Sequence, residues 1–184
     1  MPAANPPAGL VLAAGSGSRF GQPKAPVVID GERLVDRAVR VLVEAGCDPV
    51  VVVLGAWVGH VEGADVVVND AWPEGMGSSL RTGLAHLRDA SDADRAVITL
   101  VDLPGLTTAA VERLLAEAPS ASAAQCTYDG ERGHPVCLAR DLWDEAIAGA
   151  RGDEGARRLL RGHADVVLVE VGDVADGADL DVPQ

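Results

Sequence analysis

The sequence predicts one α/β domain, in which a mostly parallel sheet with one antiparallel strand is covered by helices on both faces. Short runs such as residues 49–54 are apolar throughout, as strands buried between two layers of helices are. They alternate with segments of helical periodicity, which is typical of parallel sheets. Asp129-Gly130 separates two further apolar runs and predicts a hairpin, hence an antiparallel strand.

The elements are expected in an alternating order along the chain. Residues 1–8 are rich in Pro and Ala and are predicted to form a disordered extension, so that the domain covers residues 9–184. The first strand is expected at 9–14, where an apolar run stops at glycines. Later strands are expected at 49–54, 66–68, 96–101, 123–128, 135–139 and 166–171. Helices are expected at 34–45, 79–87, 107–118, 142–150 and 154–160.

The charge of the chain bears on the partners it can have. With 15 Lys and Arg against 28 Asp and Glu, the net charge is −13. This argues against a protein that coats nucleic acid or an anionic membrane through its overall field. An anionic substrate needs only local positive charge and stays possible. The single lysine, Lys24, could reflect a genome that favours arginine.

The cysteines and the apolar runs indicate the compartment. Cys47, Cys126 and Cys137 are far apart and have no spacing of a zinc or redox pair, so we expect reduced, structural cysteines in a cytoplasmic protein. The N-terminus lacks the basic segment of a signal peptide. No apolar run approaches the roughly 20 residues of a membrane helix.

A glycine-rich loop at 14–24 follows the first predicted strand. In open α/β sheets ligands bind beyond the carboxyl ends of the strands. Glycines there let backbone N–H groups approach phosphates, and Arg19 and Lys24 add positive charge. A sharp turn with two solvated bases is the alternative, but glycines, hydroxyls and two cations together favour phosphate binding.

Two named phosphate motifs do not match this loop. A P-loop needs Gly-Lys-Ser/Thr at the start of a helix, whereas Lys24 lies between prolines in Pro23-Lys24-Ala25-Pro26. The glycine spacing is one residue longer than the dinucleotide fingerprint. That fingerprint also expects an acid after the second strand, which here ends Val53-Leu54-Gly55-Ala56. A nicotinamide cofactor is therefore disfavoured.

Asp102 lies at the end of the predicted strand 96–101. Pro104 denies the following loop a backbone donor and directs it away from helix. Mg²⁺ prefers carboxylates together with substrate phosphates, so an acid at this place is a natural ligand. A turn or capping aspartate is the alternative, and the position at the strand end favours the metal.

Six short motifs follow one another along the chain. Residues 12–24 match L-A-A-G-x-S-x-R-M-G-x-x-K, with Phe20 for the usual Met. The others are N-D-A-W-P-E-G-M-G-S-S-L (69–80), D-L-P (102–104), G-H-P-V (133–136), G-D-E-G-A-R (152–157) and D-L-D-V-P (179–183). In this order they resemble the motifs of the nucleotidyltransferases related to the molybdenum cofactor cytidylyl- and guanylyltransferases, and the resemblance covers residues 9–184. It implies a Rossmann-like, GT-A-like nucleotidyltransferase domain.

The resemblance also implies roles for single residues. Arg19 and Lys24 would hold a triphosphate and, with Asp102, carry catalysis. Asp102 and Asp179 would hold Mg²⁺, with Asp181 as an alternative second ligand. On the acceptor side stand His134, otherwise a structural histidine, and Asp153, otherwise a helix N-cap. The nucleotide would be held by Leu12, Ala13, Ala14, Gly15, Gly17, Ser18, Arg19, Lys24, Gly75, Ser78 and Ser79.

The implied reaction transfers CMP from CTP to a phosphorylated acceptor such as molybdopterin and releases pyrophosphate. L-A-A-G with G-M-x-x-S-L resembles the cytidylyl branch, since the guanylyl branch more often has L-A-G-G. Contact with a molybdoenzyme or its maturation factor would follow. The alternatives are another nucleotide such as GTP, another acceptor, an NAD(P)-dependent oxidoreductase, or a nucleotide-binding protein without turnover.

Overall fold

The centre of the fold is the strand β1 (Ala8–Leu12), whose five residues are all buried. In the computed structural model, which describes residues 5–181, β1 lies between two parallel neighbours, β4 (Val50–Leu54) and β6 (Arg95–Leu100). The strand begins one residue before the predicted domain, because Ala8 is fully buried and pairs with Ala96. Residues 1–4 of the predicted extension lie outside the described part.

The main sheet has seven strands in the order β5-β4-β1-β6-β8-β7-β9. Within the described residues, β8 alone runs against its neighbours in this sheet, so the prediction of one antiparallel strand is confirmed. A two-stranded ribbon that the sequence did not predict, β2 (Val28–Ile29) with β3 (Glu32–Arg33), precedes the first helix. The remaining strands are β5 (Asp65–Val68), β7 (Ala123–Tyr128), β8 (Glu131–Ala139) and β9 (Val166–Glu170).

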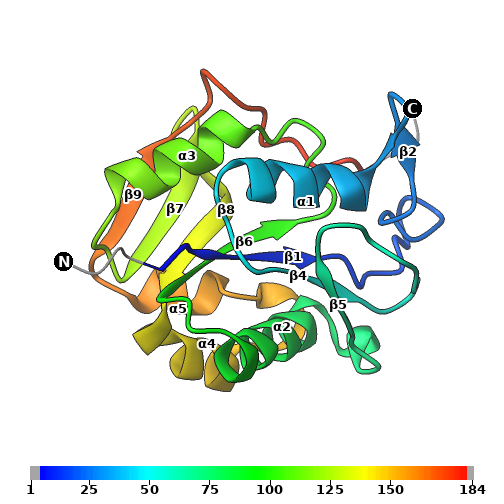
Figure 1. Ribbon diagram of the computed structural model, residues 1–184, viewed down its shortest axis with the longest axis horizontal. Coiled ribbons are helices and arrows are strands. Elements are labelled where there is room, and N and C mark those ends of the chain that lie inside the picture. The colour runs from blue at the N-terminus through cyan, green and yellow to red at the C-terminus, as the bar shows by residue number, and fades with distance from the viewer. Residues whose placement is uncertain (1–4, 182–184) are drawn as a thin grey trace.

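Helices cover both faces of the sheet, as predicted (Figure 1). The helices α1 (Leu34–Glu44) and α3 (Thr108–Glu117) lie on one face. On the other face lie α2 (Met76–Ala90), α4 (Trp143–Gly149) and α5 (Arg157–Gly162). Successive β1 side chains point to opposite faces, so Val11 joins the first core while Leu10 and Leu12 join the second.

Two predicted helix boundaries are wrong. The helix expected from residue 79 begins at Met76, directly after Gly75, whose φ of 102° ends the preceding 3₁₀ turn η1 (Trp72–Glu74). The helix expected over 154–160 begins only at Arg157. Gly155 adopts φ 51° and ψ −128°, which no helix tolerates, and separates α5 from the 3₁₀ turn η3 (Gly152–Glu154). A third 3₁₀ turn, η2 (Arg140–Leu142), precedes α4.

The cysteines are free and buried, as a structural role predicts. Burial raises the pKa of Cys47 and of Cys126 to about 12, so that both thiols stay protonated at neutral pH. Among residues 5–181, no helix combines the length and the apolar character that a membrane span requires.

Candidate active site

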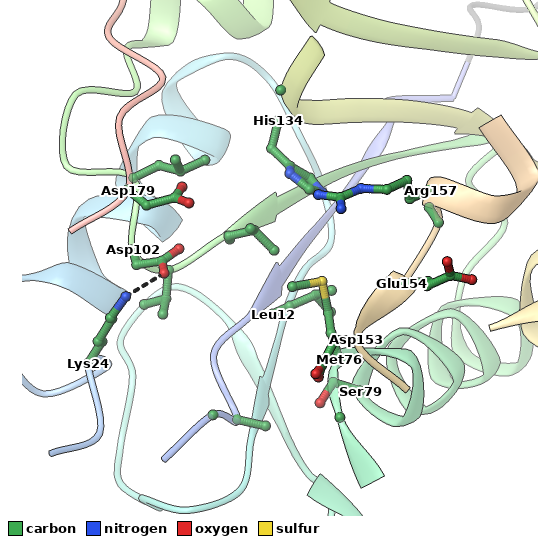
Figure 2. A pocket seen from close by; sticks show the side chains of 18 of the residues that line it. Leu12, Lys24, Met76, Ser79, Asp102, His134, Asp153, Glu154, Arg157 and Asp179 are labelled. Atoms are coloured by element: carbon green, nitrogen blue, oxygen red, sulfur yellow. Dashed lines mark hydrogen bonds and ion pairs between the residues drawn. The ribbon is translucent and has the colours of Figure 1, made fainter. Parts of the chain in front are cut away.

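A cavity of about 920 Å³ opens at the carboxyl ends of β1 and β6. Segments far apart in the sequence line it: residues within 12–24, 72–79, 100–103, 125–136, 153–161 and 177–181. Most of the predicted site residues line this one cavity (Figure 2). Two do not. Ala13 packs into the core below, and Ser78 is buried, with its hydroxyl donating to the carbonyl oxygen of Gly75.

The glycines of the first loop act in different ways. Gly17 has φ 62°, and a Cβ there would collide with the carbonyl oxygen of Gln22, so that only glycine allows the loop to fold back on itself. A Cβ on Gly15 would meet no atom within 4 Å, so the backbone at this residue is open to the cavity. The exposed side chain of Arg19, in the same loop, also lines the cavity.

Lys24 faces the acids of the opposite wall. Its Nζ donates to Oδ2 of Asp102 at 2.8 Å and lies 3.8 Å from Oδ1 of Asp181. The side chains of Lys24 and Asp102 are only 13% and 21% exposed, so their attraction is screened less than that of a surface pair. The predicted triphosphate cation and the predicted metal ligand are therefore direct neighbours (Figure 2).

The C-terminal segment brings Asp179 to this place. The backbone N–H of Leu180 donates to the carbonyl oxygen of Asp102 at 2.9 Å, and that of Asp176 donates to Gly105 at 3.1 Å. The Leu180 side chain is buried in the core, which anchors the segment between the two acids. Val182 and Pro183, the end of the predicted motif, lie outside the described residues.

Burial and the nearby charges of Asp102 and Asp181 raise the pKa of the Asp179 carboxyl. Acids that repel one another at the mouth of a cavity suit a divalent cation, which would relieve this repulsion. In the described part of the chain, no three His, Cys, Asp or Glu side chains form a group that could hold a metal ion. Asp102 and Asp179 would therefore offer a divalent cation two carboxylates, and its other ligands would come from substrate phosphates and water.

Asn69 is a site residue that the sequence did not single out, although it opens the second motif. Its buried side chain donates to the hydroxyl oxygens of Ser78 and Ser79, at 2.8 and 3.1 Å. The hydroxyl of Ser79, which lines the cavity, thereby accepts a hydrogen bond from Asn69 and keeps its own proton for a ligand. In the sequence, the one feature that pointed to Asn69 was its position as a polar residue directly after a predicted strand.

Asp153 does not cap a helix. The residue at the N-cap of α5 is Ala156, and Asp153 instead lies against the start of α2, where a Cβ on Gly75 would be 2.6 Å from its Oδ1. Gly77 is equally tight, since a Cβ there would lie 2.7 Å from the backbone nitrogen of Arg151. The glycines of the second motif thus make room for residues 150–155, and both Asp153 and Ser79 line the cavity (Figure 2).

His134 lies on β8, with its side chain beside that of Arg157 (Figure 2). Burial, and then the positive charge of Arg157, lower the pKa of His134 to about 4, so the imidazole is neutral at pH 7.

The turn between β7 and β8 is fixed by Glu170. Its carboxylate accepts hydrogen bonds from the backbone N–H groups of Gly130 and Asp129, and these and further bonds lower its pKa to about 2.

The sequence of residues 9–167 matches the family model of the MobA-like NTP transferase domain. The chain belongs to this family. It is 37% identical to a nicotine blue oxidoreductase from Paenarthrobacter nicotinovorans, over 94% of this chain and 91% of that protein. It is 33% identical to a molybdenum cofactor guanylyltransferase from Xanthomonas euvesicatoria, over 82% of this chain and 76% of that one.

Solved structures agree with the assignment to the MobA-like family. A crystal structure of Rv0371c from Mycobacterium tuberculosis superposes with a TM-score of 0.80, at 28% identity, over 98% of this chain and 94% of that one. The same mycobacterial protein has a crystal structure in complex with manganese. The Rossmann-like nucleotidyltransferase fold predicted from the six motifs is therefore confirmed.

Proposed function

We propose that the protein is a Mg²⁺-dependent nucleotidyltransferase that transfers CMP from CTP to the phosphate of molybdopterin. One observation carries this proposal: the glycine-rich loop, Lys24 and the acids of two distant segments surround a single cavity. Membership of the MobA-like family and the manganese complex of a structural relative support a metal-dependent transfer. A cytoplasmic location and contact with a molybdoenzyme or its maturation factor belong to the same proposal.

The reaction needs little from a protein base. A phosphate oxygen of the acceptor attacks the α-phosphorus of CTP and forms a P–O bond. The bond from that phosphorus to the bridging oxygen breaks, and its electron pair leaves with pyrophosphate. A phosphomonoester has a second pKa of about 6, so the nucleophile is already largely ionised at neutral pH. Catalysis then rests on positioning and on neutralising charge.

Arg19 and Lys24 supply positive charge for the triphosphate. The Nζ of Lys24 also donates to Asp102, so this cation lies between the proposed triphosphate and the proposed metal ligand. Asp102 and Asp179 would hold Mg²⁺, which supplies further neutralisation of the phosphate charge as the bridging bond breaks. The open backbone at Gly15 would approach the nucleotide closely.

Two features of the cavity favour cytosine as the base. Ala14, which lines the cavity, stands in the L-A-A-G motif where the guanylyl branch more often has glycine. The hydroxyl of Ser79 has a proton to donate, and cytosine offers two acceptors on its pairing edge, O2 and N3. Guanine offers one acceptor and two donors there, and GTP is the second candidate because relatives of this chain are named guanylyltransferases.

An oxidoreductase is a further candidate function, because one relative is named nicotine blue oxidoreductase. The end of β4 argues against an NAD(P) site. The place of a ribose-binding acid is taken by Gly55, where a Cβ would lie 2.7 Å from that of Trp72. A side chain there has no room.

One experiment separates these candidates. Purified protein is incubated with Mg²⁺, molybdopterin and each NTP in turn, and pyrophosphate is measured. We expect release with CTP. Release with GTP alone would replace the cytidylyl proposal by a guanylyl one. Binding of NAD(P)H without pyrophosphate would favour the oxidoreductase, and nucleotide binding without either would favour a protein that lacks turnover.

A further inference from the structure

The arginines of the protein fall into two groups. Most of them donate to a carbonyl oxygen or form an ion pair within the protein, for example Arg81 with Glu74 and Arg113 with Asp173. Across residues 5–181, the arginines without any such partner are Arg19, Arg132, Arg157 and Arg158. The first three line the cavity. In an acidic chain of net charge −13, guanidinium groups left unpaired around one cavity indicate an anionic ligand.

Arg157 stands on the wall that faces Lys24 and Asp102. It is the first residue of α5, and its side chain is exposed to the cavity beside His134 (Figure 2). The positive charge of Arg157 contributes to the lowered pKa of His134 on β8, in keeping with this placement beside the imidazole. Lys24, at the end of the glycine-rich loop, lies on the other side of the cavity (Figure 2).

We propose that Arg157 binds the phosphate of the acceptor, the group that attacks the nucleotide. This rests on the proposed function, because only a transfer between two phosphates brings two anions into one cavity. Arg19 and Lys24 serve the triphosphate, and the second anion needs a cation of its own on the far wall. A guanidinium suits it, since its planar fork donates two parallel hydrogen bonds to a phosphate.

The packing of the preceding turn explains how Arg157 is positioned. Residues 150–155 rest on Gly75 and Gly77 at the start of α2, and Arg81 of α2 donates to the carbonyl oxygen of Ala150 at 2.9 Å. The turn that ends at Arg157 is thus fixed to the motif that faces the nucleotide. A shared support of this kind holds two substrates at a constant separation, which is what an in-line transfer requires.

The first test compares three variants in the pyrophosphate assay. R157A should raise the KM for molybdopterin at least tenfold while the KM for the NTP changes less than twofold. R157K keeps the charge but loses the fork, so it should restore only part of the affinity. R158A is the matched control, because Arg158 is adjacent, exposed and also unpaired but does not line the cavity. Equal KM values for molybdopterin in R157A and R158A would overturn the assignment.

The second test needs no turnover and so separates this assignment from the proposed function. The protein is saturated with Mg²⁺ and a non-hydrolysable CTP analogue, and binding of inorganic phosphate is followed by ³¹P NMR. Wild type and R158A should bind phosphate, and R157A should bind it at least tenfold more weakly. Phosphate binding that is absent from wild type, or unchanged in R157A, refutes the subsite. If wild type binds phosphate but releases no pyrophosphate with any NTP, the proposed function alone fails.

Discussion

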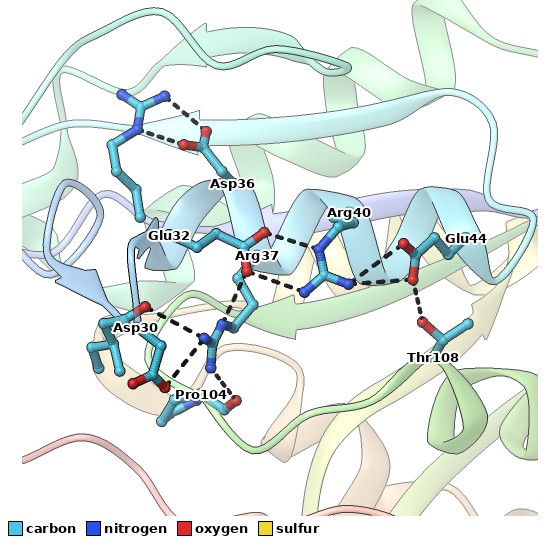
Figure 3. A network of polar contacts seen from close by, with 10 residues as sticks. Asp30, Glu32, Asp36, Arg37, Arg40, Glu44, Pro104 and Thr108 are labelled. Atoms are coloured by element: carbon cyan, nitrogen blue, oxygen red, sulfur yellow. Dashed lines mark hydrogen bonds and ion pairs between the residues drawn. The ribbon is translucent and has the colours of Figure 1, made fainter.

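Charged side chains are arranged in opposite ways on α1 and in the cavity. At α1, Glu32 of the preceding strand β3 lies between Arg37 and Arg40 of the helix, with contacts of 3.3 and 2.9 Å, and Arg40 also reaches Glu44 (Figure 3). The charges cancel locally, and Arg40 and Arg37 hold the pKa of Glu32 below its usual value. In the cavity, acids crowd around Lys24 while Arg157 lacks an acid. The charges at α1 are balanced within one network, whereas the cavity keeps an excess of acid on one wall and an arginine without an acid on another, which indicates where charged ligands bind.

The scaffold nevertheless supports the site. Arg37 donates to the carbonyl oxygen of Pro104 at 3.1 Å, within the loop that begins at Asp102 (Figure 3). The same guanidinium donates to the carbonyl oxygen of Ile29 on the β2–β3 ribbon. The paired network thus connects the loop of the candidate metal ligand to the segment that follows Lys24.

The largest effect is expected for D102N. The change removes the charge of a candidate metal ligand and half of the ion pair with Lys24, while the amide keeps the shape of the side chain. We expect the kcat of pyrophosphate release to fall by about 1,000-fold or more, the several kcal/mol that a metal ion contributes to such a step. Circular dichroism should stay unchanged. A variant with near-normal turnover would remove Asp102 from the metal site.

K24A should have the next largest effect. Loss of one cation that stabilises the transition state lowers kcat by roughly 30- to 1,000-fold, which corresponds to about 2–4 kcal/mol. The measurement is turnover at saturating CTP and Mg²⁺, so that weaker binding is not mistaken for slower chemistry. Unchanged kcat would mean that Lys24 belongs with the paired charges of the scaffold, neutralising Asp102 and nothing more.

A14G tests the base side of the cavity. Removing one methyl group enlarges the space beside the base, and one such group in a pocket is worth about 1–3 kcal/mol of discrimination. The ratio of kcat/KM for CTP to that for GTP should fall by about tenfold. A116G is a suitable comparison, because Ala116 is exposed on α3 and does not line the cavity. An unchanged ratio in A14G would show that Ala14 does not select the base.

The smallest effect is expected for R40A, which removes a paired arginine of α1. Its side chain is 48% exposed, and pairs of this kind contribute about 0.2–1 kcal/mol each. Urea unfolding should show a loss of about 1 kcal/mol, and kcat and both KM values should equal those of wild type. A turnover defect as large as that of K24A would contradict the division between the balanced charges at α1 and the separated charges of the cavity.

Much of the fold was predictable because the information is local. The apolar run before Gly15, the periodicity of 34–45 and the turn at Asp129-Gly130 each depend on neighbouring residues. The predictions were wrong where packing between segments distant in the sequence sets the local structure. Nothing near Asp153 in the sequence shows that its turn rests on Gly75, more than seventy residues away, so a helix cap was the natural but wrong prediction.

The candidate site likewise has parts that the local sequence predicts and parts that depend on packing between distant segments. The motifs around Lys24, Asp102 and Asp179 marked those residues, and the structure brings all three to one cavity. The roles that the motifs imply for them stay predictions. Arg157 also stood in a motif, but its importance was not visible, because sequence does not show which arginines find an acid.

By itself the sequence determined the order of strands and helices, the family and the positions of the motifs, since these depend on residue type and spacing. Only the tertiary structure decided which charges meet. Lys24 and Asp102 come from segments 78 residues apart, and their Nζ and Oδ2 atoms are 2.8 Å apart because parallel strands end at the same edge of the sheet. Charges interact through space, and their partners are set by the folding of the chain.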